Sequence, residues 1–147
     1  MTYEVTGRQK LTNSGCAFFS FSGTPSAGNP LTPAITGSSS NFTPTIVGNN
    51  IRLPAGEYFL RFYGAITRTS NTSNLTYQWR ESGGALVGVI GATNREIAPG
   101  AQNNSFDSAD AHISISATTD YNIEMVSVDS NLTLDTTNTH AVIWSVI

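Results

Sequence analysis

The amino-acid sequence predicts an all-β domain in which two antiparallel sheets of about eight to ten strands pack as a sandwich. Only 12% of the residues are charged, and Ser, Thr, Asn and Gly are abundant instead. Ser, Thr and Asn disfavour helices because their side chains compete for backbone hydrogen bonds, whereas Thr, Val, Ile, Tyr and Phe favour strands. No segment carries apolar residues at helical spacing, and turn residues recur about every 8–14 positions.

Alternation of apolar and polar residues between these turns predicts the individual strands. They are residues 16–22, 46–47, 51–53, 57–68, 75–81, 85–90, 111–117, 121–128 and 140–147, with 31–36 and 132–134 as further short candidates. The first strand places Phe19 and Phe21 on one side and Phe18 on the other. The segment 23–41 is rich in proline and is expected to form a long loop, with 31–36 as a short edge strand inside it.

The segment 57–68 is the clearest strand in the sequence, and a Pro-Ala-Gly turn precedes it. Its aromatic residues fall on both sides, with Tyr58 and Phe62 on one side and Phe59 and Tyr63 on the other. A strand that is apolar on both sides is normally covered on both. We therefore expect the opposite sheet to cover one side and another subunit to cover the other.

The C-terminal half contains a long polar stretch and a strongly apolar end. Residues 91–109 are expected to form a loop, because Pro99 and Gly100 lie among several Asn and Gln residues. The last strand, 140–147, is apolar on both sides. We expect Trp144 and Ile147 in the core, so that deletion of this strand would abolish folding.

The length of 147 residues is that of a single domain. We divide the chain into an N-terminal arm, 1–15, and one folded domain, 16–147. The net charge is −3 and Lys10 is the only lysine, so no basic cluster is present to bind nucleic acid or anionic lipid. No apolar run approaches the roughly 20 residues that cross a bilayer, and no signal-peptide pattern is visible. We expect no nucleic-acid or membrane partner and synthesis in a host cytoplasm.

Residues that carry catalysis or bind metals are sparse. Cys16, His112 and His140 each begin a predicted strand, and no motif joins them as a nucleophile and base. Asp107 and Asp110 lie in an oxygen-rich stretch with two Asn residues, which calcium favours, but the spacing of an EF-hand is absent. We predict no enzymatic activity, no cofactor and no resident metal, with a calcium ion in this stretch as the alternative.

Two aromatic residues on the strand 75–81 have two interpretations. Tyr77 and Trp79 alternate with Gln78 and Arg80. An aromatic ring stacks on a sugar while neighbouring polar groups bind its hydroxyls, so Tyr77 and Trp79 are possible glycan contacts. An aromatic residue on an alternating strand also fits the core, and the sequence favours that interpretation.

Three patches of the sequence resemble a known family. They are the aromatic strand Ala17-Phe18-Phe19-Ser20-Phe21-Ser22, the stretch Leu53-Pro54-Ala55-Gly56-Glu57-Tyr58-Phe59-Leu60-Arg61-Phe62 with its Gly-x-Tyr pattern, and the terminal Ala141-Val142-Ile143-Trp144-Ser145-Val146-Ile147. Their order is similar to that in the trimeric jelly rolls of the tumour-necrosis-factor and complement-head type, and in their counterparts in tailed-phage structural proteins. The resemblance spans nearly the whole chain, although its motifs are short, and no collagen-like or coiled-coil stalk accompanies them.

The resemblance implies a ten-stranded, two-sheet jelly roll that forms a homotrimer. It also implies that aromatic residues of the Gly-x-Tyr strand line the three-fold axis. Carried onto this sequence, the trimer-interface candidates are Tyr58, Phe59, Phe62 and Tyr63, from one or the other side of that strand.

The sequence-based hypothesis for function is a non-enzymatic virion protein. We expect a trimeric capsid decoration (cement) protein whose partner is the major capsid protein, with the arm 1–15 and the segment 23–45 touching the shell. The alternative is a receptor- or glycan-binding knob of a phage tail fibre. The closeness of the first strand to the start of the chain favours decoration.

Overall fold

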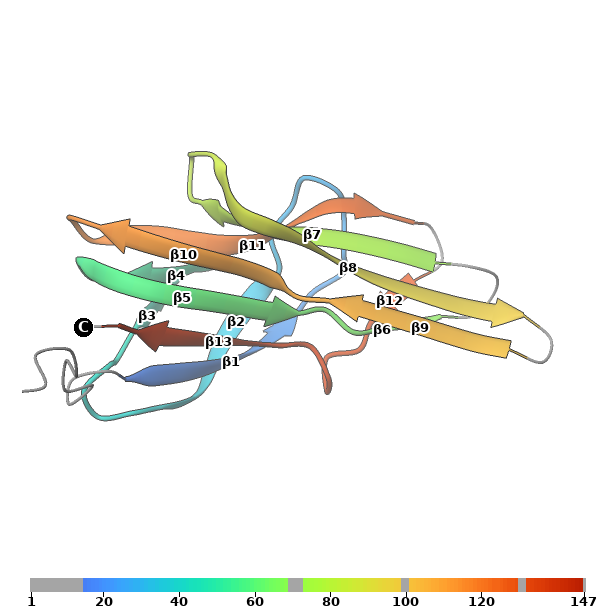
Figure 1. Cartoon of the computed structure of the whole chain (residues 1–147), viewed down its shortest axis with the longest axis horizontal. Coiled ribbons are helices and arrows are strands. Elements are labelled where there is room, and N and C mark those ends of the chain that lie inside the picture. The colour runs from blue at the N-terminus through green and yellow to red at the C-terminus, as the bar shows by residue number, and fades with distance from the viewer. Residues whose placement is uncertain (1–14, 69–72, 99–100, 130–131, 147) are drawn as a thin grey trace, which may run out of the picture.

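The computed structural model describes residues 15–68, 73–98, 101–129 and 132–146, and within these ranges all regular structure is β (Figure 1). The predicted all-β class is confirmed. The strands are β1 (Cys16–Ser22), β2 (Thr32–Ser38), β3 (Thr45–Val47), β4 (Asn50–Leu53), β5 (Gly56–Tyr63), β6 (Ile66–Arg68), β7 (Ser73–Glu81), β8 (Leu86–Ala98), β9 (Ala101–Asp107), β10 (Ala109–Ile115), β11 (Thr119–Val128), β12 (Leu132–Leu134) and β13 (His140–Ser145).

The strands form two antiparallel layers of a jelly-roll sandwich. The first sheet has the order β2-β1-β13-β5-β10, and the second has the order β3-β4-β11-β7-β8 with β9 beyond β8. The layers join where β10 meets β8, through the pair Asp110 and Val89. A separate two-stranded ribbon, β6 with β12, extends from one end. Figure 1 shows β1, β13, β5 and β10 side by side in the first sheet.

The core lies between the two sheets and is dominated by aromatic and branched side chains. Phe62 is fully buried and meets Phe21 and Tyr77 edge to face, with ring centroids 5.0 Å and 4.8 Å apart. Aromatic pairs prefer this geometry because the positive edge of one ring faces the negative face of the other. The largest fully buried side chains are Trp79, Tyr77, Phe19, Phe62, Leu31, Ile51, Leu53, Leu60, Leu75, Ile123, Met125 and Ile143.

The predicted strand 57–68 is interrupted in the structure. β5 ends at Tyr63 and β6 begins at Ile66. The break occurs at Gly64, where an added Cβ would lie 2.7 Å from the ring of Tyr77. The carbonyl of Gly64 accepts a hydrogen bond from the Thr93 hydroxyl instead of joining the sheet.

The prediction of a long loop at 91–109 was wrong. Residues 92–98 of β8 pair residue by residue with 101–107 of β9. The paired residues are close in the sequence, so closing the loop between them costs little chain entropy. The backbone pairing therefore outweighs the low strand propensity of Asn and Gln. The Asn and Gln composition concealed this hairpin.

The expectation that Trp144 lies in the core was also wrong. On β13, Ala141 and Ile143 point inward and are fully buried, so the alternation of the strand turns Trp144 outward, where it is 40% exposed. Ile147 lies outside the described residues. β13 occupies the centre of the first sheet between β1 and β5, so the predicted loss of folding on its deletion stays a prediction.

The proline-rich segment after β1 is more ordered than a simple loop. The edge strand expected near 31–36 is confirmed as β2, which among the described strands pairs with β1 alone. Before it, the backbone of Gly28 donates to Met125, and Leu31 donates to Ile123, so this stretch lies along β11. The arm expected at 1–15 falls outside the described residues except for Gly15.

Candidate functional site

The outward side of the first sheet carries an exposed cluster of aromatic and apolar side chains. We call it the aromatic face, and its members are Phe18, Phe59, Tyr63, Val89, His112, His140, Val142 and Trp144. Phe59 is 46% exposed and Val89 is 65% exposed. Scattered single apolar residues are normal on a surface, whereas a contiguous patch indicates an interaction site.

Strand register brings these side chains together. Phe59 on β5 lies opposite Trp144 on one side and His112 on the other. The rings of Phe59 and His112 stack, with centroids 4.4 Å apart and planes inclined by 14°. On the same side of β13, two residues before Trp144, Val142 lies opposite Phe18 of β1. Residues that are far apart in the sequence therefore form one continuous surface.

Two hollows flank the contact between Phe59 and Trp144. One, of about 500 Å3, is floored by β5 and β10 and bordered by Val89 of β8. The other, of about 430 Å3, lies toward Cys16 and Ser39. Apolar side chains of a partner can enter such hollows and displace water, which makes the aromatic face better suited to a protein partner than a flat surface would be.

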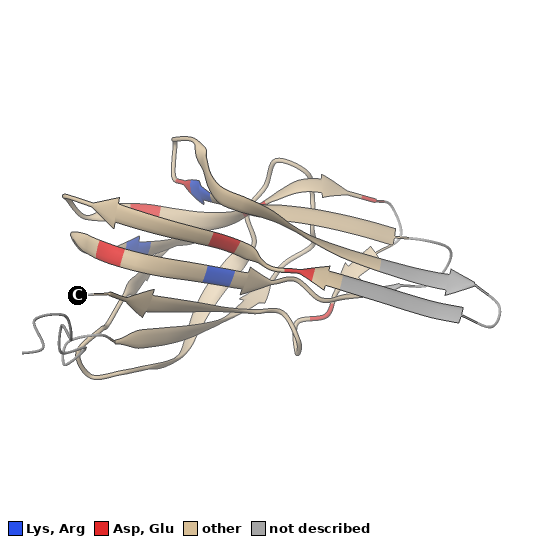
Figure 2. Cartoon of the chain, in the orientation of Figure 1, with Lys and Arg blue, Asp and Glu red and all other residues tan. Residues whose placement is uncertain are grey.

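The few charges on the aromatic face are paired. Strands β1 and β13 carry no Lys, Arg, Asp or Glu, whereas β5 carries Glu57 and Arg61 and β10 carries Asp110. Figure 2 shows the charges of this sheet confined to a few positions. Arg61 donates to both carboxylate oxygens of Asp110, at 2.8 Å and 2.9 Å, and this hydrogen bonding lowers the pKa of Asp110. His112 contacts Glu57 at 2.5 Å. Paired charges can be covered at lower cost than isolated ones.

The four trimer-interface candidates divide between the two sides of β5. Phe59 and Tyr63 point outward onto the aromatic face, whereas Tyr58 and Phe62 are buried in the core. The Gly-x-Tyr pattern has a structural cause here, because the Tyr58 hydroxyl donates to the carbonyl of Pro54 at 2.9 Å and its ring covers Gly56. Tyr58 and Phe62 therefore cannot contact a partner directly, and burial raises the pKa of Tyr58.

The glycan role considered for Tyr77 and Trp79 is ruled out by their position. Both side chains are fully buried. The Trp79 Nε1 donates to the carbonyl of Ala109 at 3.1 Å, and the Tyr77 hydroxyl donates to that of Asp107 at 2.9 Å. Neither ring has a face open to a sugar, so the core interpretation of these residues is the right one.

The residues weighed for catalysis and metal binding do not assemble into a site within the described ranges. No group of three or more His, Cys, Asp or Glu side chains is close enough there to hold a metal. Asp110 is engaged by Arg61, and the side chains of the two Asn residues near it in sequence lie outside what the structure describes. No hydrogen bond joins Cys16 to His112 or His140 in the described structure. Over the same residues, no helix is long and apolar enough to span a membrane.

Sequence reasoning missed most of the aromatic face. It singled out Phe59 and Tyr63 but not Phe18, Val89 or Trp144. A signal was present, because the strands 16–22 and 140–147, like 57–68, carry apolar residues on both sides. The outward position of Val89 had no such signal, since it depends on a bulge in β8 at Gly88, where φ is +73° and an added Cβ would lie 2.1 Å from the carbonyl oxygen of Asp110.

Comparison with known proteins identifies the fold. No family model matches the chain, and no curated protein matches its sequence. Murine APRIL has a similar structure at 11% identity, with a TM-score of 0.59 over 90% of this chain and 98% of that chain. Eiger TNF from S. frugiperda has a TM-score of 0.58 at 12% identity, over 88% of this chain and 90% of that chain. The globular domain of zebrafish complement 1qA protein has a TM-score of 0.53 at 10% identity, over 91% and 96%. The chain has the jelly-roll fold of tumour-necrosis-factor and complement-head domains.

Proposed function

We propose that this protein is a non-enzymatic structural domain that associates with further copies of itself through the aromatic face to form a homotrimer. The observation that carries the proposal is the contiguous exposure of Phe59, Trp144 and Phe18 on one sheet, flanked by two hollows. Burying a large apolar side chain is worth about 1.5–3 kcal/mol. Several such side chains per subunit supply the driving force against the entropy lost on association.

A second apolar surface of the same chain lies beside the aromatic face and is suited to a ring of three copies. In a closed ring, each copy presents one surface to the next copy and a different surface to the previous one. Next to Val89, the exposed Ile90 of β8 forms a small apolar edge that does not belong to the aromatic face. We infer that this apolar edge of one copy packs into the hollows beside Phe59 and Trp144 of the next. The resemblance of the sequence to trimeric jelly rolls favours three copies.

The native mass in solution tests this association. Light scattering on a sizing column should give the mass of three chains for the unmodified protein and of one chain for Phe59→Ser. The control is Leu86→Ser, which removes an exposed apolar side chain from β8 at its pairing with β7 in the second sheet and should leave the mass unchanged. A single-chain mass for the unmodified protein would refute the proposal, and so would a Phe59→Ser trimer.

For the biological role, we propose that the trimer decorates a phage capsid and is a component of the virion, made in the host cytoplasm. The low charge and the Ser-, Thr- and Asn-rich composition support a passive surface component. The arm 1–15 is the part proposed to touch the shell. The exposed residues of the segment 23–45 are the second proposed contact, because the backbones of Gly28 and Leu31 already bond to β11 and that of Ser39 bonds to Cys16.

Mass spectrometry and immunogold labelling of gradient-purified particles test the virion role. Decoration predicts many copies, spread over the shell and bound to the major capsid protein. Deletion of the arm should leave a folded trimer that no longer binds the particles. A few copies confined to the tail would contradict decoration and support the tail-fibre alternative. Absence of the protein from the particles would refute both roles.

A further inference from the structure

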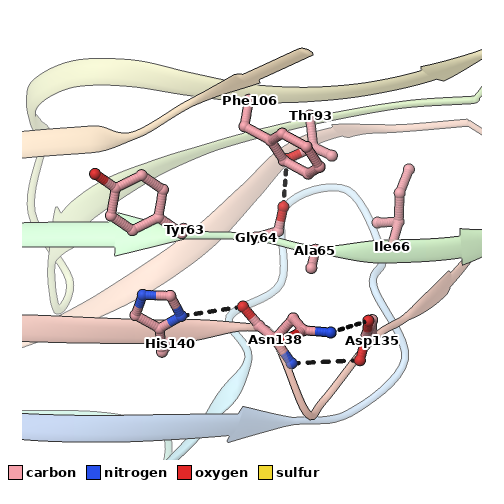
Figure 3. Close-up of a pocket in the computed structure, with 9 residues that line it drawn as sticks. All are labelled: Tyr63, Gly64, Ala65, Ile66, Thr93, Phe106, Asp135, Asn138 and His140. Atoms are coloured by element: carbon pink, nitrogen blue, oxygen red, sulfur yellow. Dashed lines mark hydrogen bonds between the residues drawn. The ribbon is translucent and has the colours of Figure 1, made fainter. Parts of the chain in front are cut away.

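A pocket of about 460 Å3 lies where the first sheet meets the hairpin of β8 and β9 (Figure 3). Strands β5 and β13, the turn before β13 and strand β9 all contribute to it. Its lining residues are Tyr63, Gly64, Ala65, Ile66, Thr93, Phe106, Asp135, Asn138 and His140. The pocket exists because the break at Gly64 separates β5 from β6, so its floor is backbone rather than side chain. Its volume is in the range of small-molecule sites.

Aromatic rings border two sides of the pocket. Tyr63 and His140 lie on neighbouring strands, with ring centroids 5.3 Å apart and planes inclined by 32°. Phe106 on β9 approaches from the other side and is 54% exposed. An apolar side chain this exposed beside a concave surface offers a flat face to a ligand, because it is not needed to fill the core.

Polar groups at the lower rim are held in place. The carboxylate of Asp135 accepts from the backbone of Thr137 at 3.1 Å and from the side-chain amide of Asn138 at 2.7 Å. His140 Nδ1 lies 3.0 Å from the Asn138 carbonyl oxygen, which only accepts, so Nδ1 carries the proton. In the neutral ring Nε2 is then a lone-pair acceptor, and it has no partner in the described structure. Ordered acceptors next to flat rings are what a hydroxyl-rich ligand requires.

We propose that this pocket binds one ring of a neutral sugar, with Phe106 stacked on the apolar face of the ring and with His140 and Asn138 bonded to its hydroxyls. A neutral ligand is favoured because Asp135 is the only carboxylate in the lining and no Lys or Arg is there to balance an anion. The N–H groups of Thr137 and Asn138 donate to both oxygens of Asp135 and partly offset its negative charge, which weakens its attraction for an organic cation. This site replaces the buried Tyr77 and Trp79 as the place where a glycan can bind.

The pocket adjoins the proposed trimer contact and shares two residues with it. Tyr63 and His140 belong both to the aromatic face and to the pocket, whereas Phe106 and Asn138 lie outside the aromatic face. Variants at Phe106 and Asn138 therefore test sugar binding without altering the surface proposed for association. Phe18→Ala serves as the matched control, because Phe18 is 47% exposed, belongs to the aromatic face and lies outside the pocket.

Ligand-observed NMR on the full chain provides the test. The probes are the methyl glycosides of glucose, galactose, mannose and fucose, with N-acetylneuraminic acid and choline as charged comparisons. At least one neutral glycoside should bind with a Kd in the millimolar range or tighter, equivalent to about −4 kcal/mol or better. Phe106→Ala and Asn138→Ala should each weaken binding roughly tenfold, and Phe18→Ala should leave it unchanged even if the native mass falls.

Three results would overturn the proposal. They are the absence of binding by all four neutral glycosides at about 20 mM, preferential binding of choline or N-acetylneuraminic acid, and unchanged binding in Phe106→Ala. Loss of the trimer in Phe18→Ala with retained sugar binding would support the pocket and show that it works independently of association.

Discussion

The outward sides of the two sheets differ although both follow the same alternation. On the second sheet, polar side chains pair with one another across the strands. Thr76 and Ser127 lie 2.6 Å apart, and Arg52 donates to both carboxylate oxygens of Asp120, at 2.8 Å and 2.9 Å. On the first sheet, Phe59, Trp144 and Phe18 occupy the equivalent outward positions.

This difference indicates which of the two sheets would gain free energy from being covered by a partner. A polar surface whose side chains are paired with each other or with water gains nothing from a partner, since association would have to replace those bonds. An exposed aromatic surface gains from being covered. The paired polar side chains of the second sheet therefore gain little from being covered, whereas the exposed aromatic residues of the first sheet support the association proposed above.

The largest expected effect comes from the two tryptophans, because Trp79 lies in the core and Trp144 on the outward side of the first sheet. Trp79→Ala should lower the free energy of unfolding by about 3–5 kcal/mol, because it leaves a cavity in the core and an unpaired carbonyl at Ala109. Trp144→Ala should cost a single chain less than about 1 kcal/mol. Urea unfolding at low protein concentration measures both. Equal losses would mean that Trp144 is part of the core after all.

Two valines test the difference between the sheets by a change of charge. Val142→Arg places a cation in the middle of the aromatic face, opposite Arg61, and should abolish association at concentrations where the unmodified protein is fully assembled. Val47→Arg, at the edge of the second sheet on β3, should have no effect. Sedimentation velocity measures the assembly of both variants. Dissociation caused by Val47→Arg but not by Val142→Arg would place the interface on the second sheet and contradict the proposal.

The smallest effect concerns two ion pairs of equal geometry, one on each sheet. Arg61 lowers the pKa of Asp110, and Arg52 lowers the pKa of Asp120, in both pairs through hydrogen bonds of 2.8 Å and 2.9 Å. A carboxylate whose pKa is lowered by folding stabilises the fold above its unfolded pKa of about 3.9, and this stability is lost as the pH falls through the lowered value.

Asp110→Asn and Asp120→Asn should therefore destabilise the protein at neutral pH and match the unmodified protein in strong acid. If the proposed association shields the first sheet from solvent, the loss in Asp110→Asn should be larger and less sensitive to salt than that in Asp120→Asn. Thermal unfolding across pH and ionic strength measures this. Equal losses with equal salt dependence would indicate that both pairs are solvent-exposed.

Much of the fold was predictable because strand alternation is local. The alternation in 16–22, 57–63, 75–81 and 121–128 predicts strands that the structure confirms. The hairpin of β8 and β9 was not predictable from composition, since Asn and Gln have low strand propensity and the pairing of the two strands is seen only in the structure. The role of Trp144 was assigned wrongly because a strand that is apolar on both sides does not reveal which side faces inward.

The sequence by itself determined the fold class, the position of most strands, and the fact that 57–68 carries aromatic residues on both sides. Only the tertiary structure decided which aromatic residues are exposed, and that Phe59, Trp144 and His112 form one surface while Phe106 and His140 border a pocket. The physical reason is that alternation along one strand is a local property, whereas the order of strands in the sheet depends on pairings between distant segments.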